Sequence, residues 1–193
     1  MNTRIETKTV VGLSLFTAIV VVLQLLGSFI RFGTFSVSLV LLPIVVGAAL
    51  YGSLSGAWLG LVFGAAVLLS GDAAAFLAVD PLGTVLTVLL KGLLAGWAAG
   101  LVYRGLQGKN RGMAVIAAAV TCPLVNTGIF LLGCQLFFMD TVSAMAQSMG
   151  FGTDVGRFIL LGLVGGNFLF ELLFNVVLSP VILRLIRLGR KEN

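Results

Sequence analysis

The sequence predicts an all-α integral membrane protein: a single bundle of about six transmembrane helices with both termini on the cytoplasmic side. The first observation is composition, because 59% of the residues are hydrophobic and 10% are charged, whereas soluble domains carry about 25% charged residues. The mean hydropathy of +1.15 agrees with this. The second is a series of long apolar segments, and the third is a bias of Lys and Arg toward one end of these segments.

Hydropathy and helix breakers divide the chain, taken as one transmembrane domain over residues 1–193, into six predicted spans. They cover residues 9–30, 37–51, 57–70, 82–103, 113–139 and 156–186. The first follows Arg4 and Lys8, and because no A-x-A cleavage site comes after it, we interpret it as a retained helix rather than a signal peptide.

The second and third spans are short and are separated only by residues 52–56, which contain two glycines and two serines. They could instead form a re-entrant pair or one broken helix. Two short spans in a thin or tilted bundle are the favoured interpretation. The fourth span begins after Pro81, the fifth contains Pro123, and the sixth follows a polar loop over residues 140–155.

The distribution of the basic residues predicts how the six spans are oriented in the membrane. Most of them fall on one side of a six-span bundle, and this side is predicted to be cytoplasmic by the positive-inside rule. They are Arg4, Lys8, Arg104, Lys109, Arg111, Arg184, Arg187, Arg190 and Lys191. The opposite side receives Arg31, Asp72, Asp80, Asp140, Asp154 and Arg157, an acidic balance, in longer loops. Long loops on one face suggest a binding site there.

Glycines recur at every fourth position in two predicted helices, at Gly56, Gly60 and Gly64 and at Gly92, Gly96 and Gly100, and Gly162 with Gly166 repeats the spacing once. This spacing places glycines on one helix face and predicts close helix packing within the chain. In the first helix, the small residues Ser14 and Ala18 could dock another membrane subunit.

Several chemistries are excluded. The chain has no histidine, which removes Ser-His-Asp catalysis and leaves Cys122 and Cys134 without a zinc partner. The nearest fragment to a Walker A motif, residues 105–110, has the wrong glycine spacing and Asn110 where Ser or Thr is needed. We therefore expect no enzyme, no cofactor, no metal site and no ATP hydrolysis by this chain. Nucleic-acid binding is not expected, because the basic residues lie at the ends of apolar runs.

Ionisable and polar groups at membrane depth are candidate functional residues, because burying them in lipid is unfavourable. Lys91 and Glu171 both lie near the middle of their spans. Asn167, Glu171 and Asn175 share one face of the sixth span by their spacing of four, and Asn126 and Thr127 lie mid-way along the fifth. These groups could line a ligand cavity, which we favour, or Lys91 and Glu171 could form a structural ion pair.

The chain resembles the substrate-binding S component of energy-coupling factor (ECF) vitamin transporters. The resemblance covers nearly the whole chain: the six-span layout, the small pair Ser14 and Ala18, and the sequence LPIVVGAALYG of residues 42–52 running into GAWLG of residues 56–60. Family members typically have alanine where this chain has Ser14. Residues 125–130, VNTGIF, are most similar to the pantothenate-type group.

The resemblance implies a multi-pass protein of a bacterial cell membrane that binds a vitamin or related micronutrient, with pantothenate favoured, at the outer face. It would hand this cargo to a transmembrane coupling subunit and two ATPase subunits, with Ser14 and Ala18 at the docking surface. The candidate substrate-binding residues are Lys91, Asn126, Thr127, Asn167, Glu171 and Arg31. An independent small-solute carrier or channel, and an intramembrane enzyme or scaffold, remain alternatives.

Overall fold

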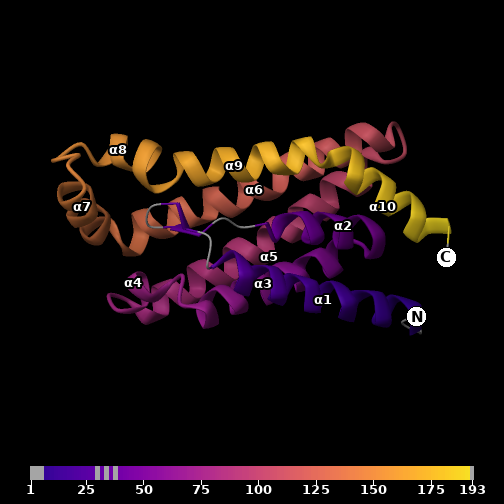
Figure 1. Ribbon diagram of the computed structural model, residues 1–193, viewed down its shortest axis with the longest axis horizontal. Coiled ribbons are helices and arrows are strands. Elements are labelled where there is room, and N and C mark those ends of the chain that lie inside the picture. Colours follow the sequence, from indigo (N-terminus) through magenta and orange to yellow (C-terminus); the bar gives the residue numbers. More distant parts are fainter. Residues whose placement is uncertain (1–6, 29–30, 33–34, 37–38, 192–193) are drawn as a thin grey trace.

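The computed structural model describes residues 7–28, 31–32, 35–36 and 39–191. Its elements in chain order are α1 (Thr7–Gly27), β1 (Arg31–Phe32), β2 (Phe35–Ser36), α2 (Leu41–Tyr51), α3 (Ser53–Ser70), α4 (Ala74–Leu77), α5 (Pro81–Leu106), α6 (Arg111–Phe137), α7 (Met139–Ser148), α8 (Val155–Arg157), the π-helix η1 (Phe158–Leu163), α9 (Gly165–Val177) and α10 (Ser179–Lys191). The long helices lie along one axis, and α1 begins at the same end of the bundle at which α10 finishes (Figure 1).

Five helical stretches in the described part of the chain are long and apolar enough to cross a membrane. They are Thr9–Gly27, Ser53–Ser70, Pro81–Leu106, Arg111–Phe137 and Val155–Val177. The sixth apolar helix, α2, has only 11 residues and rises roughly 16 Å, about half of the hydrocarbon thickness. The fold is therefore an all-α membrane bundle, as predicted, with one helix that is too short to cross by itself.

The connection between α1 and α2 contains the only strands among the described residues. Strands β1 and β2 pair antiparallel, with Arg31 opposite Ser36 and Phe32 opposite Phe35. The hairpin lies beyond the end of α1, toward the end of the bundle that carries α4 and α7, and α2 runs from there back toward the end at which α1 begins (Figure 1). Helix α2 thus occupies most of the short second span predicted over residues 37–51, of which residues 37–38 lie outside the described part of the chain.

The third span is longer than predicted. Helix α3 begins at Ser53 and not at residue 57, which gives it 18 residues. The chain reverses at Gly52 alone, whose φ of 99° lies in the region that only glycine adopts easily. A single glycine in this conformation therefore replaces the longer turn predicted over residues 52–56.

Helices α3 and α5 approach closely through their glycines. A β-carbon on Gly60 would collide with the carbonyl group of Gly92, and one on Gly92 would collide with that of Gly60. Gly56 and Gly96 face each other in the same way one turn away. Backbones can meet at this distance only where no side chain separates them, so the glycine spacing acts in packing within the chain, as predicted.

Polar side chains cap the two longest helices. The carboxylate of Asp80 accepts a hydrogen bond of 3.0 Å from the backbone N–H of Gly83, and Pro81 occupies the first turn of α5. The side-chain oxygen of Asn110 accepts from the N–H of Met113 at the start of α6. These caps satisfy N–H groups that a helix start leaves unpaired. Helix α6 then continues without a break past the buried Pro123.

The last predicted span, residues 156–186, is not one helix. It is divided into α8, η1 and α9, and α9 ends before a separate helix α10. Pro180 lies in the first turn of α10, and because it has no N–H to donate, the helix before it cannot continue regularly. In α10, Ile182 and Ile186 are buried while Arg184 and Arg187 are exposed, as expected of a helix at the edge of the membrane.

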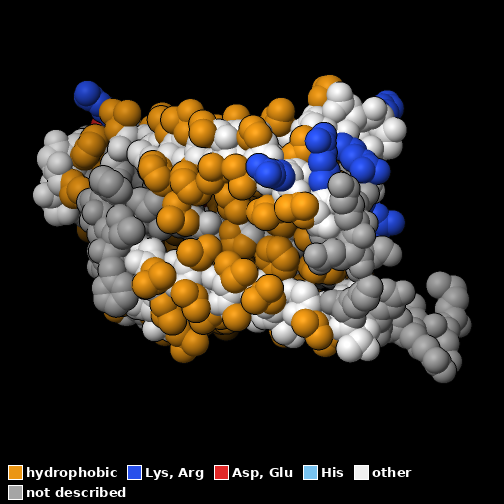
Figure 2. All heavy atoms as spheres, turned by 45° about the vertical axis from the view of Figure 1, so that its right-hand side comes forward, with side chains coloured by type: hydrophobic (Ala, Val, Ile, Leu, Met, Phe, Trp, Pro, Cys, Tyr) orange, Lys and Arg blue, Asp and Glu red, His pale blue; other side chains and the backbone are white. Residues whose placement is uncertain are grey.

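Charge is concentrated at the two ends of the bundle. Figure 2 shows a broad belt of apolar side chains across the visible face, with most of the Lys and Arg side chains gathered at one end. The turn between α5 and α6 and the helix α10 carry described basic residues, whereas Asp80, Asp140 and Asp154 lie in the connections at the opposite end. The molecule therefore has a basic end and an acidic end on either side of an apolar belt.

Candidate functional site

A cavity lies among α1, α3, α5, α6, η1 and α9. Its volume is about 100 Å³, whereas a cavity of roughly 10–15 Å³ holds one water, so it has room for a small organic molecule. Its polar lining residues are Gln24, Asp72, Lys91, Asn126, Thr127 and Glu171, and its aromatic ones are Phe63, Phe76, Phe130 and Phe168. Because Asp72 and Phe76 belong to the connection between α3 and α5, the cavity extends from the acidic end toward mid-depth.

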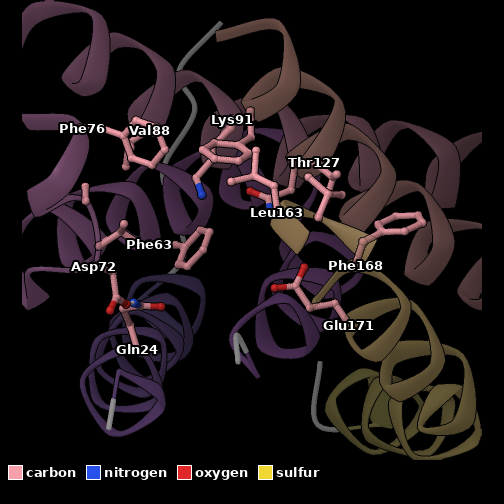
Figure 3. Close-up of a pocket in the computed structure, with 15 residues that line it drawn as sticks. Gln24, Phe63, Asp72, Phe76, Val88, Lys91, Thr127, Leu163, Phe168 and Glu171 are labelled. Carbon is pink, nitrogen blue, oxygen red and sulfur yellow. Dashed lines mark hydrogen bonds between the residues drawn. The ribbon is translucent and has the colours of Figure 1, made fainter. Parts of the chain in front are cut away.

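Lys91 extends into this cavity from α5 (Figure 3). Its Nζ lies 5.7 Å from the centroid of the Phe63 ring on α3 and 5.3 Å from that of Phe130 on α6. Both distances allow a cation–π interaction, which is stronger where water is excluded. The two rings therefore hold the ammonium group in place while leaving its N–H donors for another partner.

Glu171 enters the same cavity from α9, on the side opposite Lys91 (Figure 3). Its side chain is 2% exposed, and it is close enough to Lys91 for the two charges to interact. A buried carboxylate is unfavourable unless a cation or hydrogen-bond donors face it. The site thus places one positive and one negative group across a small space.

Helix α6 contributes an amide to the lining of the cavity. Asn126 is 6% exposed and lines the cavity, and its Oδ1 has no hydrogen-bond partner among the described residues. An unsatisfied buried acceptor destabilises a fold by about 1–3 kcal/mol. The neighbouring Thr127 also lines the cavity. A ligand that donates a hydrogen bond to Asn126 would remove this penalty.

Gln24 and Asp72 form a polar edge at the acidic end of the cavity. The side-chain N–H of Gln24 donates to Oδ2 of Asp72 at 2.7 Å. This bond joins the end of α1 to the loop after α3. Asp72 was not among the predicted binding residues, because a carboxylate just after a transmembrane span is typical of an ordinary loop.

Four predicted binding residues line the cavity together: Lys91, Asn126, Thr127 and Glu171. The side chains of the other two, Arg31 and Asn167, lie outside the part of the chain that the structure describes. Asn175 is buried, at 2% exposed, but is not among the lining residues.

Aromatic residues from several helices also line the cavity, namely Phe63, Phe76, Phe130 and Phe168. Sequence reasoning did not single out Phe63. The only signal for it is its place one turn after Gly60 on the helix face that meets α5.

Comparison with known protein families finds a match over nearly the whole chain. A family model described as ECF transporter, substrate-specific component, matches residues 8–183. The chain belongs to this family. No curated protein and no solved structure matches it. The resemblance inferred from the sequence is thereby confirmed at the level of the family, whose members are the substrate-specific membrane subunits of ECF importers.

This substrate-specific component also presents an open helix face. Ser14 and Ala18 are both exposed on α1, and the hydroxyl of Ser14 donates to the backbone carbonyl of Val10 at 2.9 Å. Only 17% of the α1 span is buried. Large apolar side chains surround the pair, among them Val10, Val11, Leu15 and Val22. The exposed face of α1 is therefore apolar around two small residues.

In the described residues, no group of three or more His, Cys, Asp or Glu side chains is placed to hold a metal ion. Cys122 and Cys134 are free and buried. The chemical resources of the cavity are hydrogen bonding, charge and aromatic contact. These are resources for recognising a molecule, which is what a substrate-specific component does.

Proposed function

We propose that this component captures a vitamin-like micronutrient, with pantothenate favoured, from outside a bacterial cell and delivers it to an ATP-driven coupling module. The cavity with Lys91 and Glu171 on opposite walls carries this proposal. At 1.5 Å per residue, Lys91 lies roughly 15 Å from the start of α5. The site would thus be open to the acidic end of the bundle.

The direction of transport follows from charge. The basic end, which holds Arg104, Arg111 and α10, is assigned to the cytoplasm by the positive-inside rule. Both termini would then be cytoplasmic, and the acidic end with Asp72 and Asp80 would face the outside. A ligand captured at the outer end must be released at the other, which requires energy that no motif of this chain supplies.

A transmembrane coupling subunit with two ATPase subunits would supply that energy. We place its docking surface on the exposed face of α1 around Ser14 and Ala18, because small residues let a partner helix approach closely in lipid. The low burial of α1 supports this placement.

The proposal is tested by titrating the purified full-length protein in detergent with pantothenate and, separately, with folate, using calorimetry without ATP. Saturable binding of one of these vitamins is expected. Co-expression with the coupling and ATPase subunits should yield a complex that Ser14→Leu with Ala18→Leu disrupts without changing vitamin affinity. Uptake into vesicles that hold this chain alone would instead identify an independent carrier.

A further inference from the structure

The two walls of the cavity offer opposite hydrogen-bonding chemistry. Lys91, on α5, has an ammonium group that can only donate. Glu171, on α9, has a carboxylate that accepts when ionised, and Asn126 contributes an Oδ1 that lacks a hydrogen-bond partner among the described residues. A ligand in the cavity therefore meets a donor at Lys91, an acceptor at Glu171 on the opposite side (Figure 3), and a second acceptor at Asn126 on α6.

A simple anion is a poor match for this arrangement. It would pair with Lys91, but it would also bring a second negative charge close to Glu171, which is 2% exposed. Like charges disfavour an ionised carboxylate. A simple anion would also leave the Oδ1 of Asn126 without a hydrogen-bond donor. A ligand that carries both an anionic group and hydrogen-bond donors meets both requirements.

Aromatic rings line the cavity around Lys91. Phe63 and Phe130 flank Lys91, and Phe76 meets Phe130 edge-on with ring centroids 5.8 Å apart. These rings have no hydrogen-bonding group to offer. The part of the ligand that lies against them should therefore be a short hydrocarbon segment.

We infer that the ligand is an acid that also carries hydrogen-bond donors: an anionic group binds at Lys91, and hydroxyl, amide or ammonium donors bind at Glu171 and Asn126. This inference rests on the proposed function, because it names the chemical class of the molecule that the component captures. It goes beyond assigning a carboxylate partner to Lys91, since it requires a second polar end. Pantothenate is one member of this class.

The test uses the small molecule that remains bound when the full-length protein is purified from cells grown in rich medium. The molecule is released with methanol and analysed by mass spectrometry. Methyl esterification reports its acid groups, and exchange in deuterated solvent counts its exchangeable hydrogens. The expected molecule has at least one acid group and at least one exchangeable hydrogen outside it.

Variants then assign the two ends of the molecule. Lys91→Gln and Glu171→Gln should each lower the retained amount at least tenfold. The controls Lys109→Gln and Asp140→Asn remove the same charges at exposed positions and should retain the full amount. Lys91→Arg keeps the cation and should retain most of it.

The double variant Lys91→Gln/Glu171→Gln separates binding from folding. It removes both charges, so that neither is left buried alone, and it should run as a monodisperse protein with near wild-type thermal stability. It should nevertheless retain no ligand. Full retention by this double variant would show that the two charges form a structural pair and would overturn the inference.

The identity of the released molecule decides the remaining outcomes. A molecule without an acid group, or an acid without further donors, would overturn this inference and leave the proposed capture function standing. A wild-type protein that releases no small molecule, and that binds neither pantothenate nor folate in the titrations above, would overturn the proposed function and this inference with it.

Discussion

The cavity lies between one wall, formed by α3 and α5, that is joined by glycine packing and another, formed by η1 and α9, that is irregular and less buried. In the α3 span 44% of residues are buried, against 18% in the span Val155–Val177. Lys91 belongs to the first wall and Glu171 to the second. The positive group thus lies on a closely packed support, and the negative group on an irregular one.

The irregularity of the second wall has a local cause. The N–H of Val164 donates to the carbonyl of Ile159, five residues back, at 3.0 Å, which is the bond of a π-helix. Such turns occur often at functional sites, because they rotate the residues that follow relative to those before. We therefore expect changes in η1 to alter the position of Glu171 and so to act on ligand binding from a distance.

The largest effect is expected where the first wall is tightest. Gly60→Val would place a branched side chain against the backbone of Gly92, and because neither helix can move away without opening the core, we expect a loss of more than about 3 kcal/mol in stability. Thermal unfolding in detergent measures this. No described atom lies within 4 Å of a β-carbon on Gly105, so Gly105→Val is the control that should stay folded.

A smaller effect is expected in the second wall. A β-carbon on Gly165 would collide with the carbonyl of Leu160, whereas one on Gly166 has no described atom within 4 Å. Gly165→Ala should destabilise the protein by about 2 kcal/mol, since overpacking in a core typically costs about 1–3 kcal/mol, and it should also weaken ligand binding. Gly166→Ala should do neither. If Gly165→Ala and Gly166→Ala had the same stability and ligand affinity, a side chain at the junction between η1 and α9 would cause no strain.

Lys91→Ala tests the charge on the closely packed wall. We expect ligand affinity to fall by at least about 1.5 kcal/mol, the lower end for a hydrogen bond to a charged group. The measurement is calorimetric titration of the purified variant with the vitamin that binds the wild type. Unchanged affinity in a well-folded variant would assign Lys91 to structure alone, and Lys109→Ala at the exposed basic end is the matched control.

The smallest effect is expected for the hydrogen bond that joins α1 to the loop after α3. Gln24→Ala removes the hydrogen bond to Asp72, and the measured range for such bonds in membranes predicts a loss of about 0.6–1.7 kcal/mol in stability. Ser143→Ala is a control, because the hydroxyl of Ser143 donates to the Met139 carbonyl within its own helix. A loss as large as that of Gly60→Val would mean that α1 is part of the closely packed wall.

Much of the cavity could be predicted from single residues. Lys91, Glu171 and Asn126 stand out in the sequence because charged and amide groups are rare in long apolar segments, and all three line the cavity. Asp72 and Phe63 could not be found in this way. A carboxylate at the end of a span and a phenylalanine within one are both ordinary in membrane proteins, and only their neighbours in space distinguish them.

The helix boundaries also fall into two groups: those that capping residues in the sequence mark, and those that depend on tertiary packing. The spans that became α5 and α6 begin at capping residues that the sequence displays, Asp80 and Asn110. The break between α9 and α10 and the π-helix have weaker signals. Pro180 indicates that a helix must change there, but whether the chain turns or only bends depends on what the next helix packs against.

The sequence by itself determined that the chain enters the membrane, which of its ends is basic, and at what depth its polar groups lie. These properties follow from the hydropathy of each segment and from counting residues along a helix, so they need no partner. The tertiary structure decided which helices meet and which side chains share a cavity, because the rotation of a helix about its axis is set by packing. It thereby placed Lys91 on a glycine-packed wall and Glu171 opposite it on an irregular one.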